Sequence, residues 1–577
     1  MLFTNFFFTK ENNIKTKQTL FWLVLSLLFS LFYSYLAWQK AIRSDYIIQD
    51  DARQHIFWML RYIDSSLFPN DLIADYFQSV APAGYKFLYW SVNKAGIDPI
   101  LFSKILPSIL GLITTLYCFA LALQLLPLPF TGFVASLLFN QNLWLQDGLV
   151  SGTPKAFAPP LLVAFLYYFL RRSTIGISIT IILFGLFYPS LVFICCGLLV
   201  ISLLEFKKWR IKLLNKKENY LFVFTGLIAA FVVLLPYAVA TSEYSPIISV
   251  AQAKELPEFF SGGRTGFFNN NAWDFWFNGS RSSLRIPSAL MPPLAYLGLL
   301  FPIIIKRNKA KDYKNNWLKT NSNIVMLPKL LLVSIVMFFV AHSVLFKLHL
   351  PSRYTQHTIR IIIILTASIV LTFIWEYLLK KVAGRTKLKT IIYRLLALLL
   401  GVILIFYPHT IKRFVWTRYI TGNEVALYEF LQQQPKDIVI ASLTAETDNL
   451  PTFTQRSILV SREYAIPYHW GYYKPFRQKA TDLIEAQYSA DIKVVENFIR
   501  KYNITHWLIE NSSFTPDYIA NNKWIRQHEP VAQQAIENMH QGKDLVIVKY
   551  QDNCSVFKSD RYTILDSQCI VRSRDNS

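Results

Sequence analysis

An acidic pair, Asp50 and Asp51, stands in the segment 45–55, which follows the first long apolar run of the chain. Adjacent carboxylates repel each other, and proteins usually offset that cost with a metal ion, a basic neighbour or a helix amino terminus. Asp51 and His55 are four residues apart on one helical face, so they can either bind a divalent metal such as Mg²⁺ or Mn²⁺ or hydrogen-bond. Capping is the alternative, because residues 52–63 resemble an amphipathic helix lying along a membrane, which Asp51 is well placed to cap.

Basic residues with the spacing of one helical face open a later apolar run. These are Arg353, His357 and Arg360. Arginine can grip phosphate with two parallel hydrogen bonds, so the group predicts a phosphate site, and Lys155 is a second candidate for that task. The alternative is that these side chains extend from an apolar helix towards lipid headgroups without binding any ligand.

Aromatic residues gather beside amides in the segment 241–285. Trp273 and Trp276 stand close to three consecutive asparagines at 269–271. A sugar ring has an apolar face and polar edges, so this composition suits sugar or acceptor binding. An aromatic belt at a membrane interface has the same composition and needs no ligand, and both interpretations stay open.

The elements that position these residues are predicted to be membrane helices. The chain has 577 residues, of which 53% are hydrophobic and 16% charged, whereas soluble domains carry about 25% charged residues. Apolar runs of roughly the length of a bilayer-spanning helix recur along it. The eleven predicted spans are 20–38, 100–126, 130–145, 157–170, 175–187, 190–204, 220–240, 287–305, 326–346, 358–378 and 390–407.

The basic residues report the orientation of these spans. They cluster in short loops, above all at 207–217, 306–319 and 380–389, with further lysines before the first span, and cytoplasmic loops accumulate lysine and arginine. An amino terminus in the cytoplasm puts all these clusters on one side, provided that 175–204 is two helices broken at Pro189. The net charge of +23 is therefore a topology signal, and no nucleic acid partner is expected.

The topology divides the chain into a membrane core, 1–409, and an extracytoplasmic α/β domain, 410–577. The first external loop is 39–99. In the carboxy-terminal domain the patterns predict helices at 424–434 and 491–502 and strands at 438–441, 457–460 and 505–509. Cys554 and Cys569 flank a hairpin-like stretch, where an external location permits a disulfide but does not require one.

The chain resembles the type-C glycosyltransferases at its start. Its amino terminus is predicted to be internal, and the first span is followed by an outer loop that opens with an acidic pair. These polytopic enzymes take sugars from polyprenyl-phosphate carriers. The segments 151–157 and 350–354 also resemble recurring features of bacterial members, and the similarity in topology extends over nearly the whole chain. The resemblance implies a GT-C-like fold in a bacterial inner membrane and an acceptor that is a glycan, a lipid or a protein.

The family also implies roles for single residues. The first-loop acid, which is catalytic base or metal ligand, maps to Asp50 with Asp51 as its neighbour. A second acid at the outer end of the third span maps to Asp147, for which an ordinary interfacial loop residue is the alternative. Arg353, with its neighbours on the same face and Lys155, would then neutralise the departing lipid phosphate.

Two other classes of function remain open. One is an uncoupled lipid or polysaccharide flippase or a polymerase, and the other is a membrane scaffold whose external domain binds a partner. The ionisable residues of the predicted spans lie near their ends, which argues against a coupled transporter. The sequence has no P-loop, dinucleotide-binding, GxSxG or HExxH motif, which argues against chemistry with a soluble cofactor.

Overall fold

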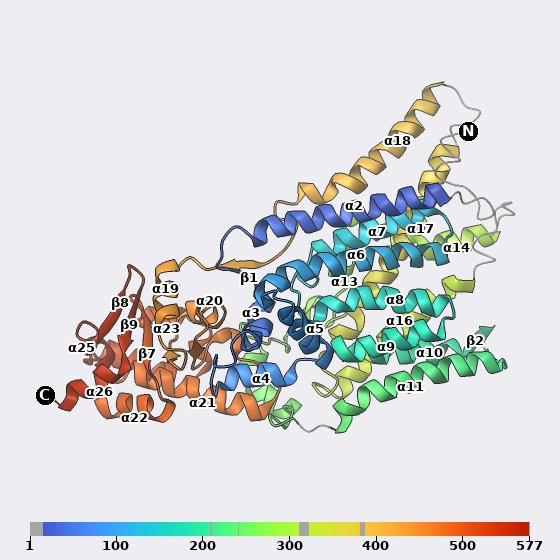
Figure 1. Ribbon diagram of the computed structural model, residues 1–577. Coiled ribbons are helices and arrows are strands. Elements are labelled where there is room, and N and C mark those ends of the chain that lie inside the picture. The colour runs from blue at the N-terminus through green and yellow to red at the C-terminus, as the bar shows by residue number, and fades with distance from the viewer. Residues whose placement is uncertain (1–15, 208–209, 240–241, 311–321, 381–386, 576–577) are drawn as a thin grey trace.

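The computed structural model describes residues 16–207, 210–239, 242–310, 322–380 and 387–575. Helices aligned in a bundle make up most of the molecule, and a body that contains a sheet lies at one end of it (Figure 1). The main helices of the bundle are α2 (Thr16–Ala41), α6 (Pro99–Leu125), α7 (Pro129–Trp144), α8 (Ala158–Leu170), α9 (Thr174–Phe187), α10 (Val192–Ser202), α11 (Lys217–Val239), α14 (Phe301–Ala310), α16 (Met326–Ser343), α17 (Ser352–Lys380) and α18 (Lys387–Phe406).

The bundle is that of a polytopic integral membrane protein. Within the described ranges, six helices are long and apolar enough to cross a membrane, namely α2, α6, α11, α16, α17 and α18. Helix α17 lies at the centre of the bundle, since 83% of its most apolar window is buried. The corresponding share for α18 is 11%, because α18 leans away from the bundle (Figure 1). The exposed leucines, isoleucines and phenylalanines of the outer helices are the surface that lipid solvates.

Each of the eleven predicted spans contains helical structure. The prediction of two helices within 175–204 is confirmed, because α9 and α10 are separated at Tyr188 and both pack against Gly226 of α11. The prediction of one continuous helix at 287–305 is wrong. Consecutive prolines at 292–293 interrupt it, so that α13 (Ile286–Ala289) is followed by a 3₁₀-helix, η7 (Pro293–Leu300), and then by α14.

The charge pattern predicts that the two ends of the bundle lie on opposite sides of the membrane. A hairpin of β2 (Leu204–Lys207) and β3 (Arg210–Leu213), which overlaps the basic segment 207–217, lies at the end away from the sheet-containing body (Figure 1). The lysines before residue 16 and the clustered residues at 208, 311–319 and 381–385 lie outside the described residues. That the hairpin end faces the cytoplasm stays a prediction.

The first external loop folds against the sheet-containing body. It holds β1 (Ile47–Gln49), α3 (Asp50–Ile56), the 3₁₀-helix η2 (Phe57–Tyr62), α4 (Leu72–Val80) and α5 (Ala83–Lys94). The expected amphipathic helix along the membrane at 52–63 is wrong, since α3 begins at Asp50 and becomes 3₁₀ at Phe57. Both pieces are largely buried, and the Phe57 ring packs 5.3 Å from that of Tyr464. The first external loop is therefore a largely buried connection between the helical bundle and the sheet-containing body.

Shorter elements complete the helical part. They are η3 (Pro154–Phe157), η4 (Pro189–Leu191), α12 (Val250–Glu255), η5 (Pro257–Phe259), the π-helix η6 (Asp274–Asn278), η8 (Ser322–Val325) and η9 (Tyr407–Thr410).

The carboxy-terminal body is an α/β domain, as predicted. Its sheet has the order β6-β5-β7-β9-β8, with β6, β5 and β7 parallel and the other two antiparallel. Its strands are β5 (Val439–Ala441), β6 (Ser457–Ile458), β7 (His506–Glu510), β8 (Ser555–Lys558) and β9 (Tyr562–Asp566), while β4 (Tyr419–Thr421) pairs with β1 instead. Its helical elements are α19 (Val425–Gln433), η10 (Ala445–Asp448), α20 (Leu450–Thr454), η11 (Arg462–Tyr464), α21 (Trp470–Gln487), α22 (Ile492–Tyr502), α23 (Pro516–Asn521), η12 (Ile525–Gln527), α24 (Val531–His540), α25 (Val546–Tyr550) and α26 (Ser567–Asp575).

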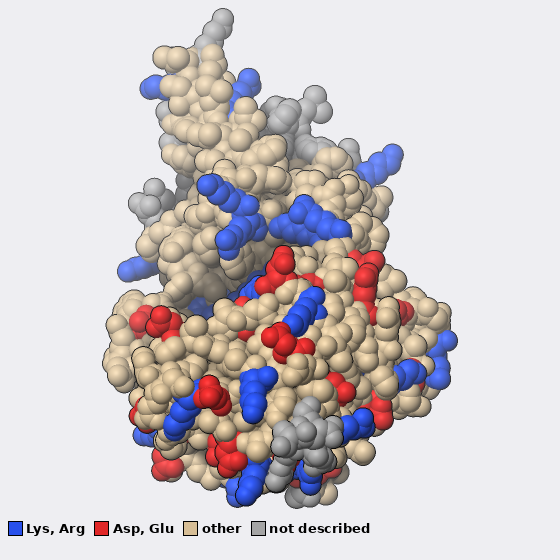
Figure 2. Space-filling model, turned by 90° about the vertical axis from the view of Figure 1, so that its left-hand side faces the viewer, with Lys and Arg blue, Asp and Glu red and all other residues tan. Residues whose placement is uncertain are grey.

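Acidic and basic side chains are interspersed over the visible face of this domain, whereas the helical part that projects beyond it is mostly uncharged (Figure 2). The expected helices and strands are present as α19, α22, β5, β6 and β7. The disulfide that the sequence left open is formed between Cys554 and Cys569, and it brackets the β8–β9 hairpin. Helix α21, the longest of the domain, was not predicted, because a run of aromatic residues and Pro475 conceal its pattern.

Candidate functional site

The acidic pair is positioned by a strand that joins the first loop to the chain after the last span. Strand β1 pairs antiparallel with β4, and the Asp50 amide donates to the Arg418 carbonyl at 3.1 Å. Gln49 caps α3, since its Oε1 accepts from the amides of Asp51 at 2.9 Å and Ala52 at 3.1 Å. The prediction that Asp51 is the cap is therefore wrong. Both carboxylates stand in the first helical turn, and their side chains are available for other contacts.

Three carboxylates converge around two shared cations. Lys155 forms an ion pair with Asp51 and lies 3.9 Å from Asp147. Arg418 lies 3.0 Å from Asp147 and 3.8 Å from Asp50. The structure thus brings together the acids that follow the first and third predicted spans with the lysine of the predicted segment 151–157.

Arg418 was missed by the sequence analysis. It lies after the last span and directly before β4, in a stretch without a motif. Its backbone adopts the left-handed region with φ 51°, which is uncommon for a residue with a side chain. No sequence signal marks it, because its role depends on the β1–β4 pairing.

The carboxy-terminal domain reaches this cluster through Glu463. Arg53 is 6% exposed and bonds to Asp50 at 3.0 Å, to Glu463 at 3.4 Å and to the Asn449 side chain at 2.7 Å. Glu463 also accepts from Arg264 at 2.6 Å. Burial raises the pKa of Glu463 to about 7, although the two arginines oppose the rise. This carboxyl was also missed, because it lies far from the membrane segments in sequence.

Protonation differs between the residues of the first loop. Burial works to raise the pKa of Asp51, but the Lys155 ammonium, helped by His55 and Arg264, holds it well below its usual range. Burial lowers the pKa of His55 to about 4, while the charge of Asp51 works against that shift. At neutral pH, Asp51 is therefore ionised and His55 is neutral.

The acidic cluster is not arranged as a divalent metal site. Among the residues that the structure describes, no group of three histidines, cysteines, aspartates or glutamates is close enough to hold a metal ion. Asp51 and Asp147 share Lys155, and Asp50 and Asp147 share Arg418, so fixed cations occupy the positions between the acids. The expected pair of Asp51 and His55 supplies two ligands at most and has a lysine beside it.

A basic group gathers where α17 begins. Arg360 donates to the Gln146 side chain, whose amide donates to the Ser288 carbonyl at 2.9 Å. Arg353 donates to Gln356 at 3.2 Å, and Gln356 bonds to His357 at 2.9 Å. The predicted residues of α17 thus lie beside the loops that carry the acids.

Arg285 connects the basic group to the acidic cluster. It was not predicted, and its backbone is left-handed with φ 61°. Burial lowers its pKa, the charge of Arg353 lowers it further, and Asp147 raises it. His357 lies close enough to interact electrostatically with Arg353, Lys155 and Arg285. Arg285 is therefore close enough to interact electrostatically with both Arg353 and Asp147.

Several buried polar atoms of this group have no partner. Within the described ranges, Nε of Arg285, Nε of Arg360 and Nδ1 of His357 are buried without a hydrogen bond, and Arg360 has no carboxylate within 4 Å. Leaving buried donors unsatisfied costs about 1–3 kcal/mol each, so in native proteins such groups usually have a partner, which is a protein group, an ordered water molecule or a bound ion. An anion with several acceptor oxygens would satisfy them.

An apolar hollow of about 320 Å³ adjoins the basic group. Gln146, which holds Arg360, is part of its wall. The other lining residues are mainly apolar, namely Leu145, Ser288, Met291, Ile411, Arg413 and Trp416. The Arg413 guanidinium lies 5.6 Å from the Trp416 ring centre. An apolar chain attached to an anion in the basic group would fit this hollow.

The predicted aromatic pair lies at η6, in the loop that leads to Arg285. Trp273 is 64% exposed and Trp276 is 37% exposed, and Trp276 packs beside His342 and two phenylalanines of α16. In the described structure neither indole hydrogen-bonds to the acidic cluster. Their contacts are those of a membrane-interface belt, and sugar binding by them stays a prediction.

No protein-family model matches this sequence, and neither does any curated protein. Among solved structures, the Archaeoglobus fulgidus oligosaccharyltransferase tethered with an acceptor peptide aligns with 91% of this chain and 72% of its own, at TM-score 0.56 and 13% identity. The archaeal oligosaccharyltransferase AglB from the same organism, in complex with an inhibitory peptide and a dolichol-phosphate, aligns with 89% of this chain and 72% of its own, at TM-score 0.55 and 12% identity. A complex of the Archaeoglobus enzyme with Zn and sulfate reaches 0.51 at 11% identity, over 89% and 70%. The chain has the type-C glycosyltransferase fold, as its resemblance to that family led us to expect.

Proposed function

We propose that the protein is a membrane glycosyltransferase that moves a sugar from a polyprenyl-phosphate carrier to an acceptor on the extracytoplasmic face, with inversion at the anomeric carbon. The buried, unsatisfied donors of Arg285, Arg360 and His357 carry this proposal. They form an anion site at the membrane end of the acidic cluster, where a lipid-linked phosphate can reach it.

The basic group would receive the leaving phosphate. Negative charge develops on the phosphate oxygens as the bond to the sugar breaks, and arginines already in place stabilise that charge without reorganisation. Arg353, Arg360 and His357 would act with Arg285, and Lys155 would lie between phosphate and acids. The polyprenyl chain would leave through the apolar hollow beside Gln146 and Trp416.

Asp50 would be the base that takes the acceptor's proton. A hydroxyl is a poor nucleophile at neutral pH, so a carboxylate within hydrogen-bond reach must remove its proton as the new bond forms. Asp51 is less suited, because Lys155 holds its pKa low. Asp147 shares both cations and would keep Lys155 and Arg418 in place. The pairing of Asp51 with Lys155 is therefore the reason for assigning the base to Asp50.

The setting would be a bacterial plasma membrane, with the carboxy-terminal domain outside the cytoplasm and the acceptor a glycan, lipid or protein. The basic β2–β3 hairpin at the opposite end of the bundle supports this orientation. The two archaeal structures were solved with an acceptor peptide and with dolichol-phosphate, which are a protein-type acceptor and a lipid phosphate of the proposed kinds.

The proposal is tested in proteoliposomes that hold the purified protein and radiolabelled polyprenyl-phosphate hexoses or pentoses, with membranes of the source cell as acceptor. We expect release of polyprenyl phosphate together with transfer of the label. Arg285→Gln and Arg360→Gln should each weaken binding of undecaprenyl phosphate about tenfold or more, because a charge-assisted bond is lost. Arg561→Gln, which removes an ion pair of the carboxy-terminal domain, is the control. Translocation of intact carrier with no release would favour a flippase and overturn the proposal.

A further inference from the structure

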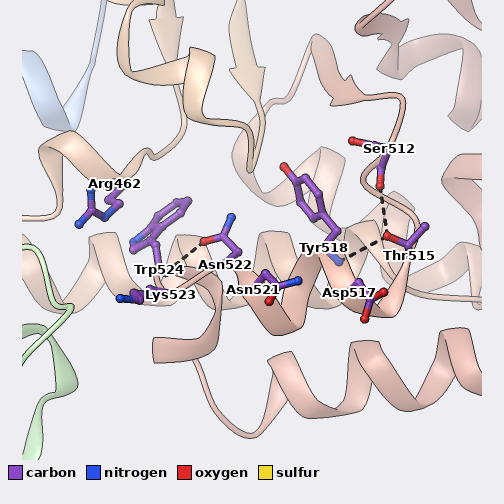
Figure 3. A pocket seen from close by; sticks show the side chains of 9 residues that line it. All are labelled: Arg462, Ser512, Thr515, Asp517, Tyr518, Asn521, Asn522, Lys523 and Trp524. Atoms are coloured by element: carbon purple, nitrogen blue, oxygen red, sulfur yellow. Dashed lines mark hydrogen bonds between the residues drawn. The ribbon is translucent and has the colours of Figure 1, made fainter.

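A hollow of about 570 Å³ lies in the carboxy-terminal domain between η11 and α23. Its walls are polar and aromatic, without an aliphatic side chain among the lining residues (Figure 3). Such a surface is unsuited to a lipid tail or an apolar peptide, which need apolar walls. A ligand for this hollow must be hydrophilic.

One end of the hollow is cationic. Arg462 and Lys523 lie near each other there, beside the Trp524 indole, whereas Asp517 lies at the opposite end (Figure 3). Both cations are exposed, and neither has a carboxylate within 4 Å among the residues that the structure describes. Two unneutralised cations side by side favour a ligand with a carboxylate or another anionic group at this end.

The middle of the hollow offers amides and aromatic rings. Asn522 uses its Oδ1 to accept from the Trp524 amide at 3.0 Å, which leaves its NH₂ group for a ligand. Asn521 has no side-chain hydrogen bond in the described structure, and the Tyr518 ring stands beside them (Figure 3). Amide donors and acceptors next to aromatic faces match the hydroxyls and the apolar face of a sugar ring.

The cationic end is also the end that leads to the reaction centre. Arg462 directly precedes Glu463, whose carboxylate bonds to Arg264 and Arg53. On the other side, the Lys523 side chain lies against Gly262, and Gln527 donates to the Gly262 carbonyl at 3.3 Å. A chain held in the hollow by its acidic group would therefore be anchored beside the elements that position Asp50.

We propose that this hollow is an acceptor subsite that binds an acidic saccharide, with the acidic group on Arg462 and Lys523 and the sugar ring among the amides and aromatics. The inference rests on the proposed function, because it names the acceptor class of that transferase. The polar lining of the hollow excludes a lipid acceptor at this place.

The test is calorimetric titration of the full chain in detergent with a tetrasaccharide of galacturonic acid and, separately, with uncharged maltotetraose. We expect the acidic tetrasaccharide to bind and the neutral one to bind at least about tenfold more weakly. The double variant Arg462→Gln/Lys523→Gln should lose the preference, and Lys493→Gln, an exposed lysine of α22, should retain it. Neither cation has an ion pair with another described residue, so the variant should keep its stability, and unchanged thermal unfolding verifies its fold.

Equal binding of both tetrasaccharides, or binding of neither, would overturn the inference. Preferential binding of an acidic peptide would overturn it in favour of a protein acceptor. No carrier is present in the titration, so its failure leaves the transferase proposal intact. Loss of carrier binding in the proteoliposome experiment, in turn, would leave a measured saccharide affinity standing.

Discussion

Arg53 of the first loop and Glu463 of the carboxy-terminal domain form a buried ion pair, with 3.4 Å between Arg53 Nη2 and Glu463 Oε2. The same nitrogen lies 3.0 Å from Asp50 Oδ1. Because Arg53 is held from both sides, the carboxy-terminal domain helps to fix the orientation of Asp50. This domain thus helps to build the candidate site.

Replacing Glu463 should impair catalysis through Asp50. Glu463→Gln leaves Arg53 with one anionic partner fewer, so Arg53 should pull Asp50 out of its productive orientation. We expect a kcat lower by about tenfold, since a misplaced base loses part of the 10²–10⁴-fold contribution of acid–base catalysis. The KM for the carrier should stay unchanged, because the proposed phosphate site consists of other residues. Steady-state kinetics checks the split.

Glu510→Gln is the matched control, since it removes an ion pair with Arg561 elsewhere in the same domain. An unchanged kcat for Glu463→Gln, or an equal loss in both variants, would contradict the positioning role.

The raised pKa of Glu463 predicts that the stability of the protein depends on pH. This pKa is raised from 4.5 to about 7 in the folded protein, so between these values the folded state keeps a proton that the unfolded state has lost. The stabilisation is complete below pH 4.5 and is lost as the pH rises through about 7. The loss amounts to about 3 kcal/mol at most.

Thermal unfolding from pH 4.5 to 8 measures this effect. The Tm of the wild type should fall with rising pH more steeply than that of Glu463→Gln, and other titrating groups cancel because both proteins share them. Parallel curves would contradict the raised pKa.

The sequence predicted the parts of the molecule that depend on local pattern. Apolar length gave the spans, Pro189 marked the break between α9 and α10, and alternating patterns gave β5 and β7. These features are determined by the residues within them, so a single sequence contains the information.

Residues whose roles depend on distant contacts could not be found in this way. Arg418, Arg285 and Glu463 become part of the site only through the β1–β4 pairing and the packing of the domain on the first loop. The capping role of Gln49 was missed for a different reason, since aspartate is the commoner cap and glutamine is rarely one.

Removing Lys155 should create affinity for a divalent cation. In the wild type this ammonium stands between Asp51 and Asp147, where a divalent ion would compete with it. Lys155→Ala leaves carboxylates with less compensation, and oxygen ligands of that kind bind Mn²⁺. We expect Mn²⁺ binding at least about tenfold tighter than in the wild type, measured by electron paramagnetic resonance, since one full charge is removed from the site.

Lys493→Ala, which removes an equal charge from the surface of α22, should leave Mn²⁺ binding unchanged. Equal affinity in the wild type and in Lys155→Ala would mean that Lys155 does not occupy a cation position.

Removing the disulfide of the carboxy-terminal domain should lower the stability of the domain, and the redox state of its cysteines in cells reports the side of the membrane on which the domain lies. Cys554 and Cys569 enclose a loop with a sequence separation of 15, and closing such a loop stabilises the fold by about 3 kcal/mol. The double variant Cys554→Ser/Cys569→Ser should lower the unfolding temperature of the domain, and reduction of the wild type should match it. In cells, alkylation should find these thiols blocked, since only an oxidising compartment maintains the bond. Freely alkylated thiols would contradict the extracytoplasmic location.

Asp50 and Asp51 should respond differently to neutralisation. Asp50→Asn removes the proposed base but leaves Lys155 paired with Asp51, so the protein should fold, bind undecaprenyl phosphate normally and lose transfer by about 10²–10⁴-fold. Asp51→Asn removes the counterion of Lys155, which leaves a partly buried ammonium with the more distant Asp147. That variant should be less stable and retain a larger share of its transfer activity. Transfer, carrier binding and thermal unfolding are measured on both variants.

The two substitutions are matched in size, charge and place in the first turn of α3, so a difference between them isolates the role of each side chain. Gln49 caps this turn in both variants, because its contacts are to backbone amides. Loss of a cap therefore cannot account for the result. If Asp51→Asn loses transfer and Asp50→Asn does not, Asp51 is the base despite its pairing with Lys155. If both variants transfer at the wild-type rate, neither carboxylate takes the proton, and the proposed mechanism is wrong.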